Sequence, residues 1–407
     1  MNEIKNCEVC GESHLESVLN LGLHPMCDDL IQVGDNRTCR EYPIEILLCN
    51  TCMTAHQRYQ VPKEELFPAD YHYRSRFTVD VLKGMESLVE SCEDNFGSLK
   101  DKMVLDIGCN DGSLLDFFKN SGALTVGIEP TDAYKDAEDR HTVYNNYLSK
   151  DVAEQVVFKH GKPDFITFTN VFAHIEDLRA MLEALKMLMK EDTVVVIENH
   201  YLGSVFDSSQ FDTFYHEHPR TYSYTSFVYM ANSLNSKIFG VEFPSRYGGN
   251  IRVFLGVNPD LALNDNELKD RIINNEKTFK NKFKELESNI ATWLTRKKPV
   301  INELVEKYGK IKAKAFPGRA AILVKMLGLN EDHISAVYEK DGSLKVGNYL
   351  PGTRIPILSD ADLFSSGDKN LPIINMAWHI SGEINNYMIK SGYTGEIIDI
   401  LSLEDYE

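Results

Sequence analysis

The sequence MVLDIGCNDGSLLDFFKNSG, residues 103–122, joins an apolar strand to an amphipathic helix through a turn of glycine and acidic residues. The segment LTVGIEP follows as a second short strand that ends at Glu129. A strand, a glycine turn, a helix and a second strand ending in an acid form half of a Rossmann fold. The glycines let the backbone approach a ligand closely, and the acid can bind ribose hydroxyls. The stretch therefore predicts an α/β domain with a nucleotide-like cofactor.

The composition of the turn separates two possible cofactors. A dinucleotide site favours Gly-x-Gly-x-x-Gly, whose amides face a pyrophosphate. Here the turn reads DIGCNDG, with Asp106 and Asp111 in or beside it. Carboxylates suit a cation without phosphates, which favours S-adenosyl-L-methionine (SAM) over a dinucleotide. The turn also resembles motif I of class I methyltransferases, with Asn110 at the second glycine position. The predicted cofactor-binding residues are Asp106, Gly108, Asn110, Gly112, Glu129 and Asn170.

Two further strands are predicted downstream of the turn. PDFITFTNVFAHIED, residues 163–177, contains an apolar run that ends at Asn170 and His174, and TVVVIENH, residues 193–200, follows a helix. Ligands of open α/β sheets bind at the carboxyl ends of the strands. The aromatic and histidine-rich stretch FDTFYHEHPRTYSYTSF, residues 211–227, comes soon after the second of these strands. We therefore expect this stretch to lie over the methyl donor.

The stretch offers the groups that methylation of a carbon atom needs. A proton must leave a carbon next to a carbonyl group, and the resulting enolate must be stabilised. His218 is the candidate base, and Glu217 can orient or charge its neighbour. Either Tyr215 or His216 can donate to the enolate oxygen. The sequence leaves this choice open, because neighbours on a strand point to opposite faces.

Two cysteine pairs near the N-terminus predict a metal site. Cys7, Cys10, Cys49 and Cys52 form two C-x2-C pairs, and such pairs bind zinc from two sides. Four thiolates complete a tetrahedral zinc site, so the predicted zinc is structural rather than catalytic. The region is also too short for a large core of its own, which makes a metal useful there. Two unpaired cysteines between the pairs are alternative ligands: Cys27 and Cys39.

Composition limits the class of the protein. A chain of 407 residues predicts two or three domains. The formal net charge is −18, and no stripe of lysine and arginine occurs, so we expect no nucleic-acid partner. The N-terminus MNEIKNCEVC has no apolar signal region, and no apolar run reaches 18 residues. These features predict a cytoplasmic chain without membrane association, as a monomer or small homo-oligomer.

The C-terminal third has a different pattern. Residues 264–310 are rich in Lys, Glu and Asn at helical spacing and predict one or two long helices. After them, apolar runs alternate with loops, which predicts a second parallel sheet.

Earlier in the chain, RYGGNIRVFLG, residues 246–256, is interpreted as a pair of strands around Gly248 and Gly249. In DYHYRSRFT, residues 70–78, tyrosines and arginines suit a sugar ring and a phosphate.

The cysteine pairs, VLDIGCNDGSLL, NVFAHIED and FDTFYHEH with its aromatic tail are similar to segments of the nucleotide-sugar C-methyltransferases of deoxysugar biosynthesis. The resemblance covers nearly the whole chain, including KVGNYLPGTRIPI and INMAWHISGEI near its end. It implies a small zinc-binding domain (1–65), a class I methyltransferase domain with a Rossmann-like fold (66–260) and a second Rossmann-like α/β domain that completes the substrate site (261–407). It also implies methylation at C3 of a 4-keto hexose that is bound to a nucleoside diphosphate.

The resemblance also implies catalytic residues. The family's Tyr-x-Glu-His falls on Tyr215, Glu217 and His218, and its strand-end histidine falls on His174. Its upstream tyrosine falls on either Tyr71 or Tyr73. One departure is that the family's Gly-x-Gly-x-x-x-Lys-Gly turn is reduced here to Gly318 with Arg319 beside it.

Three other functions remain open from the sequence. A SAM-dependent enzyme of this plan could methylate oxygen or nitrogen of a sugar or related small molecule instead of carbon. A zinc-ribbon protein that binds nucleic acid is disfavoured by the acidic balance of the chain. A binding module without catalysis is disfavoured because scaffolding has no need of Tyr-His-Glu-His above a cofactor site.

Overall fold

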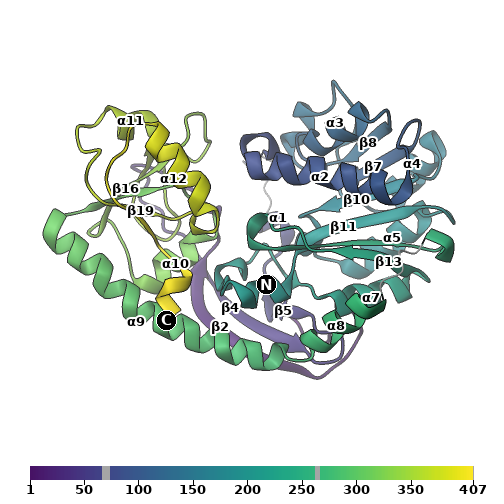
Figure 1. Ribbon diagram of the computed structural model, residues 1–407, viewed down its shortest axis with the longest axis horizontal. Coiled ribbons are helices and arrows are strands. Elements are labelled where there is room, and N and C mark those ends of the chain that lie inside the picture. The colour runs from purple at the N-terminus through teal and green to yellow at the C-terminus, as the bar shows by residue number, and fades with distance from the viewer. Residues whose placement is uncertain (67–73, 262–265, 407) are drawn as a thin grey trace. The chain divides into compact units, whose positions relative to one another are not determined.

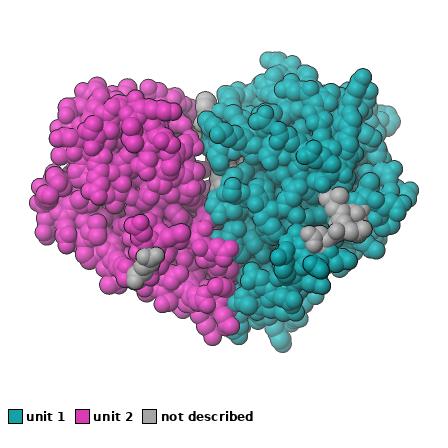
Figure 2. Space-filling view, viewed as in Figure 1, with its two compact units in different colours: residues 1–16, 47–204, 218–280 teal, residues 17–46, 205–217, 281–407 magenta. Residues whose placement is uncertain are grey.

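The computed structural model describes residues 1–66, 74–261 and 266–406 (Figure 1). The chain divides into two compact units (Figure 2). Unit 1 comprises residues 1–16, 47–204 and 218–280, and unit 2 comprises residues 17–46, 205–217 and 281–407. Each unit is thus assembled from three separate segments. This spatial division does not test the three consecutive domains expected from the sequence, whose borders at residues 65 and 260 stay predictions.

Unit 1 is built on a seven-stranded sheet with the order β13-β14-β11-β10-β7-β8-β9. Strands β7 to β11 run parallel, β14 is antiparallel to β11, and β13 is antiparallel to β14. The strand bounds are Met103–Ile107 (β7), Leu124–Ile128 (β8), Thr142–Tyr144 (β9), Phe165–Thr169 (β10), Val194–His200 (β11), Lys237–Glu242 (β13) and Asn250–Gly256 (β14). The predicted strand, turn, helix and second strand are confirmed as β7, α3 (Ser113–Asn120) and β8.

The central strands are buried on both faces, as in parallel sheets that are covered by helices on either side. Val104 on β7, Phe165 on β10 and Val196 on β11 pack into one core with α2 (Val79–Phe96) and α3. Figure 1 shows the sheet flanked by helices. The crossover helices α4 (Lys150–His160) and α5 (Leu178–Leu188) carry apolar residues at helical spacing. Their N-caps are Ser149 and Asp177, whose side chains accept backbone N–H groups.

A buried ion-pair network connects β11, β14 and α2. Glu198 is fully buried, and its carboxylate lies 2.6 Å from Arg246 Nε and 2.8 Å from Arg252 Nε. Arg252 also reaches Glu242, and Arg246 Nη1 donates to the Val81 carbonyl group of α2. Such a network is strongly destabilised when one partner is displaced, because a buried charge is then left uncompensated.

The interpretation of residues 246–256 as a pair of strands is wrong. Residues 246–248 form a short 3-10 helix, Arg246–Gly248, and only β14 follows. The antiparallel partner of β14 is the earlier strand β13. Gly249 has φ 124°, and a Cβ at this position would overlap the Ser204 side chain. Glycine is therefore needed here because the backbone passes close to Ser204, and not because residues 246–256 form a hairpin.

The N-terminal strands form a four-stranded sheet of order β12-β5-β4-β2. The bounds of these four strands are Leu15–Pro25 (β2), Glu41–Cys49 (β4), Ala55–Gln57 (β5) and Arg220–Thr221 (β12). Two further antiparallel pairs are formed by Asn2–Glu3 (β1) with Tyr59–Gln60 (β6), and by Ile31–Gln32 (β3) with Asn348–Tyr349 (β17).

Unit 2 contains the second parallel sheet, which confirms that expectation. Its order is β18-β16-β15-β19-β20, and all pairings are parallel. The bounds of its elements are Ile311–Lys314 (β15), Ala320–Leu327 (α10), Ile334–Glu339 (β16), Ile357–Ser359 (β18), Asp360–Ser365 (α11), Ile373–Asn375 (β19), Ser381–Lys390 (α12) and Ile397–Asp399 (β20). The predicted long helices are α8 (Asn266–Glu276) and α9 (Phe279–Tyr308).

The remaining α-helices are short. They are α1 (Lys63–Leu66), α6 (Leu202–Asp207) and α7 (Tyr224–Ser233). Among the described residues, none of the helices combines the length and the apolar character that crossing a membrane requires.

We predict that Gly84→Ala destabilises the protein, although alanine is the better helix former. A Cβ at residue 84 would overlap the Arg246 side chain, which must then leave Glu198. We expect the free energy of unfolding to fall by about 3 kcal/mol or more, measured by urea denaturation. The neighbouring exposed Lys83→Ala is the control and should change the free energy by less than about 0.5 kcal/mol. Equal stability of Gly84→Ala and the wild type would refute this role of Gly84.

Candidate active site and metal centre

The turn between β7 and α3 adopts conformations that place its backbone close to a ligand. Gly108, Asn110 and Gly112 all have positive φ, at 73°, 49° and 79°. A Cβ at Gly108 would lie 2.5 Å from Val171 Cγ2, so only glycine fits there. Asn110 tolerates the left-handed region better than most residues, which explains how it replaces a glycine.

Glu129 closes this turn from the end of β8. It is buried, and its Oε2 accepts the Asn110 N–H at 2.9 Å. Its Oε1 accepts the N–H and the hydroxyl of Thr131 at 2.9 and 2.6 Å. A carboxylate has about four acceptor positions, so these three bonds leave one for a ribose hydroxyl. The predicted residues of the turn and Glu129 are thus brought together.

Asp106 lies at the same edge, on β7. Its pKa is raised to about 7: burial is the main cause and the nearby charge of Glu129 adds to it, whereas the hydrogen bond from Thr167 opposes the shift. Thr167 Oγ1 donates to Asp106 Oδ1 at 2.6 Å. A bound cation would offset the burial of this carboxylate, which suits the positive charge of SAM.

Asn170 follows β10 in the left-handed region, with φ 54°. Its N–H donates to the Glu198 carbonyl group at 2.8 Å, and its Oδ1 accepts from Asn250 Nδ2 at 3.2 Å. Asn250 Nδ2 also donates to the Glu198 carboxylate at 3.0 Å. The buried network of Glu198 therefore holds Asn170 at the carboxyl edge of the sheet, beside the cofactor turn.

His174 and His218 meet in unit 1. Their rings are tilted with centroids 4.7 Å apart, and both side chains are partly exposed. His174 ends a 3-10 helix, Phe172–His174, that starts two residues after Asn170. The pair of imidazoles therefore lies at the carboxyl edge of the sheet, where the sequence predicted it.

Tyr215 and Glu217 belong to unit 2. Burial, as the main cause, raises the pKa of Glu217 well above its usual value, and the charge of Asp28 adds to this, whereas Lys345 opposes it. Burial of Glu217 therefore favours its protonated form, in which the carboxyl group can donate a hydrogen bond. Burial also raises the pKa of the Tyr215 phenol well above its usual value, followed by the charge of Glu217, so Tyr215 keeps its proton and can donate as well.

His216 has a structural environment. Its Nε2 lies 3.2 Å from the Tyr42 carbonyl oxygen, and its ring meets the Tyr42 ring edge-on. Burial lowers its pKa to about 4, so the ring is neutral and its Nε2–H donates to that carbonyl group. Between the two candidate donors to an enolate, Tyr215 is thus the better one. The alternative upstream tyrosines, Tyr71 and Tyr73, lie outside the described residues.

Arg319, at the departure from the family's glycine turn, forms part of a polar cluster in unit 2. Its Nε lies 3.3 Å from Asp212 Oδ2, and its guanidinium group lies 5.6 Å from the centre of the Trp378 ring. Trp378 Nε1 donates to the same Asp212 oxygen at 2.9 Å. Arg319 is therefore held by contacts within unit 2.

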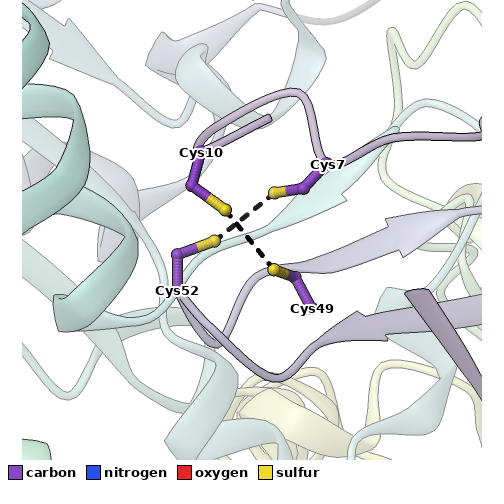
Figure 3. Close-up of side chains that lie close together, drawn as sticks. All are labelled: Cys7, Cys10, Cys49 and Cys52. Atoms are coloured by element: carbon purple, nitrogen blue, oxygen red, sulfur yellow. Dashed lines mark hydrogen bonds between the residues drawn. The ribbon is translucent and has the colours of Figure 1, made fainter. Parts of the chain in front are cut away.

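The four predicted zinc ligands converge (Figure 3). The sulfur atoms of Cys7, Cys10, Cys49 and Cys52 all lie within 4.8 Å of one another, with Cys7–Cys52 at 3.4 Å and Cys10–Cys49 at 3.5 Å. Zn–S bonds of about 2.3 Å in a tetrahedron give S–S distances of about 3.8 Å, so the four thiols fit zinc. They are the one such cluster among the described residues. The alternative ligand Cys39 instead donates to the Asp29 carbonyl group.

Each cysteine pair forms the same tight turn. Gly11 N donates to the Cys7 carbonyl group at 2.9 Å, and Met53 N donates to that of Cys49 at 2.8 Å. Gly11 and Met53 both have positive φ. This repeated turn aims both thiols of a pair to the same side.

Residues that the sequence analysis missed surround the zinc site. Thr54 Oγ1 lies 3.0 Å from Cys52 Sγ, and His56 Nε2 lies 3.3 Å from Cys7 Sγ. Glu8 pairs with the buried Arg220, which lies opposite His56 in the β5–β12 ladder. Polar contacts of this kind orient metal ligands. Their only signal in the sequence is closeness to the cysteines, and for Arg220 there is none.

Three family models match the chain in succession. They describe a zinc binding domain over residues 7–67, a methyltransferase domain over residues 83–236 and a C-methyltransferase C-terminal domain over residues 245–397. The chain therefore contains a methyltransferase domain between a zinc binding domain and a C-methyltransferase C-terminal domain. Its central domain is therefore a class I, Rossmann-like methyltransferase fold, as predicted.

Individual relatives agree with this class. The C-methyltransferase NovU of Streptomyces niveus is 26% identical over 392 residues, which cover 94% of this chain and 91% of NovU. A ubiquinone biosynthesis O-methyltransferase of Escherichia fergusonii is 30% identical over 98 residues, which cover 23% of this chain and 41% of that enzyme. The structure of magnesium protoporphyrin IX methyltransferase from Synechocystis with bound SAM is 16% identical, with a TM-score of 0.33, covering 44% of this chain and 80% of that one. The family models and NovU, rather than this weak structural similarity, establish the class.

The C-methyltransferase is thus a SAM-dependent enzyme with a small-molecule substrate. The preference for SAM over a dinucleotide is confirmed, as is the four-cysteine zinc site. The roles of the individual site residues stay predictions.

The raised pKa of Asp106 predicts a pH-dependent stability. Between about pH 4 and pH 7 the unfolded state releases this proton and the folded state keeps it, so stability falls as pH rises. Asp106→Asn removes this titration and keeps the acceptor for Thr167. We expect the free energy of unfolding of the wild type, relative to this variant, to fall by about 2 kcal/mol between pH 5 and pH 7 in urea titrations. The exposed Asp139→Asn is the control, and a constant difference for Asp106→Asn across this range would contradict the shift.

The metal centre predicts that Cys7→Ser loses zinc and destabilises the N-terminal region. Metal content measured by atomic absorption should fall from about one zinc per chain, and the thermal transition should broaden or shift to lower temperature. Cys39→Ser is the matched control, because a hydroxyl can also donate to the Asp29 carbonyl group. Wild-type protein without zinc, or full zinc in Cys7→Ser, would refute the assignment.

Proposed function

We propose that this C-methyltransferase acts on a keto sugar linked to a nucleotide, at C3 of a 4-keto hexose, through an enolate. The observation that carries the proposal is the pair of partly exposed imidazoles, His174 and His218, at the carboxyl edge of the methyltransferase sheet. Transfer to oxygen or nitrogen needs little more than orientation, whereas transfer to carbon needs a base that takes a proton from carbon. The match to a C-methyltransferase C-terminal domain supports the same choice.

The chemistry has two steps. In the first, His218 accepts the proton from C3, and the electron pair of the broken C–H bond forms the enolate while the carbonyl π pair moves onto oxygen. SAM, when bound, supplies a methyl group on a positively charged sulfur. With SAM held at the β7–α3 turn, C3 would form a bond to this methyl group with the enolate electron pair, and the electrons of the S–CH3 bond would stay on sulfur.

Neighbouring side chains have supporting roles in the proposal. His174 packs against the His218 ring and fixes its orientation. Tyr215 and Glu217 lie shortly before His218 in the chain, and burial raises the pKa of both side chains, which favours the protonated forms that can donate hydrogen bonds. Groups of this kind stabilise negative charge on an enolate oxygen. Asp106, Gly108, Asn110, Gly112, Glu129 and Asn170 are assigned to SAM.

We predict that His218→Asn abolishes methyl transfer and leaves SAM affinity within about twofold. Loss of a general base lowers the rate by about 10²–10⁴-fold. Turnover is measured with 4-keto hexoses that carry thymidine, uridine, cytidine or guanosine diphosphate, and affinity is measured by calorimetry. His14→Asn is the control, because His14 is exposed and lies beside Glu12 in the zinc region. Normal turnover by His218→Asn would show that another group is the base.

The same substrates distinguish carbon from oxygen or nitrogen as the acceptor. Wild-type enzyme in heavy water with S-adenosylhomocysteine should introduce deuterium at the carbon beside the carbonyl group. Methyl transfer without any such exchange would favour the second reading, a methyl group placed on oxygen or nitrogen.

A further inference from the structure

Asn199, near the end of β11, has a buried amide group with an unusual hydrogen-bond pattern. The side chain is 1% exposed, and its Oδ1 accepts the Ala173 N–H at 3.4 Å. Because a backbone N–H can only donate, the amide oxygen must face Ala173 and Nδ2 must point elsewhere. Asn199 Nδ2 is enclosed and has no hydrogen-bond partner in the part of the chain that the structure describes.

A second strand-end asparagine shows the usual arrangement. Asn375 ends β19 in unit 2, and its Oδ1 accepts the Ala377 N–H at 3.0 Å. Its Nδ2 donates to Asp399 at 2.7 Å, so both ends of the amide are bonded. Nearly all buried polar groups are satisfied in this way. The unbonded donor of Asn199 is therefore an exception that a bound ligand would explain.

The position of Asn199 indicates which ligand. The residue before it, Glu198, pairs with Thr169 of β10, and its carbonyl group accepts the Asn170 N–H. Ala173, which fixes the amide oxygen of Asn199, directly precedes His174. Asn199 thus lies between a residue assigned to SAM and the imidazole pair of His174 and His218. Its neighbours Glu198 and His200 alternate to the other face of the strand, so Asn199 is separate from the arginine network.

We propose that Asn199 Nδ2 donates a hydrogen bond to the carbonyl oxygen of the keto substrate. The inference rests on the proposed function, because it assigns a donor to the oxygen that gains charge when His218 takes the proton. As the C–H electron pair enters the enolate, the carbonyl oxygen becomes negative and the bond from Asn199 strengthens. A rigid donor that is already in place is the arrangement that stabilises such a charge most. Asn199 is then a further catalytic residue of the same reaction.

Two substitutions test this role. Asn199→Asp keeps the acceptor for the Ala173 N–H and removes the donor, and Asn199→Leu replaces the amide by an apolar group of similar size. Asn232→Asp, at an exposed position on α7, controls for the added charge. The readouts are deuterium exchange beside the carbonyl group with the nucleotide-linked 4-keto hexoses and S-adenosylhomocysteine, kcat for methyl transfer, SAM affinity by calorimetry and the thermal transition.

We expect both Asn199 variants to lose about 10²–10³-fold in exchange rate and in kcat, with SAM affinity within about twofold and a retained thermal transition. Exchange at the wild-type rate in either folded variant would overturn the inference and leave the proposed function standing. A parallel loss of SAM affinity would assign Asn199 to the cofactor instead. Failure of both variants to fold would make the amide structural and would also overturn the inference. Wild-type enzyme that exchanges none of the sugars would refute the proposed function itself.

Discussion

The parallel register of β7, β10 and β11 is the constraint on which the candidate active site depends. Ile107 pairs with Phe168, and Thr169 pairs with Glu198, so the three strands end at one edge of the sheet. Asp106, Asn170 and His174 lie on these strands or within a few residues of their ends, and His218 meets His174 there. Because successive side chains point to opposite faces, a shift of one residue would turn every side chain to the other face and break contacts such as that of Thr167 with Asp106, so the register is strongly specified.

Burial also prepares the chemistry of this edge. Away from water, Asp106 retains its proton up to about pH 7, and Glu198 is stable only because two arginines and an asparagine surround it. A bound cation would stabilise the ionised form of Asp106. The carbonyl group of Glu198 accepts the N–H of Asn170, whose backbone is left-handed. Pre-organised polar groups in a dry environment interact more strongly with a developing charge than the same groups would in water.

Much of this was predictable because local sequence carried it. The strand, glycine turn, helix and acid of residues 103–129 and the two C-x2-C pairs are short-range patterns with a direct physical meaning. Pairings between distant residues were not predictable: Arg246 and Arg252 meet Glu198 only after β14 has folded against β11. The strand pair expected around Gly248 and Gly249 was wrong for the same reason. The glycines indicate a tight turn of the backbone, but they do not show that β14 pairs with the earlier strand β13. Likewise, only the fold shows that His216 is occupied by the Tyr42 carbonyl group and that Asn199 has an unbonded donor.

The interleaving of the two units affects how the chain folds during synthesis. Residues 17–46 are made well before residues 281–407, which belong to the same unit. The sheet of unit 1 is likewise complete only after residues 218–280 have been made, because this segment contains β13 and β14. Contacts over such long sequence separations slow folding and leave apolar strands exposed in the meantime. The nascent chain should therefore depend on chaperones, and early zinc capture by the N-terminal cysteines would give it a first fixed point around which the later segments assemble.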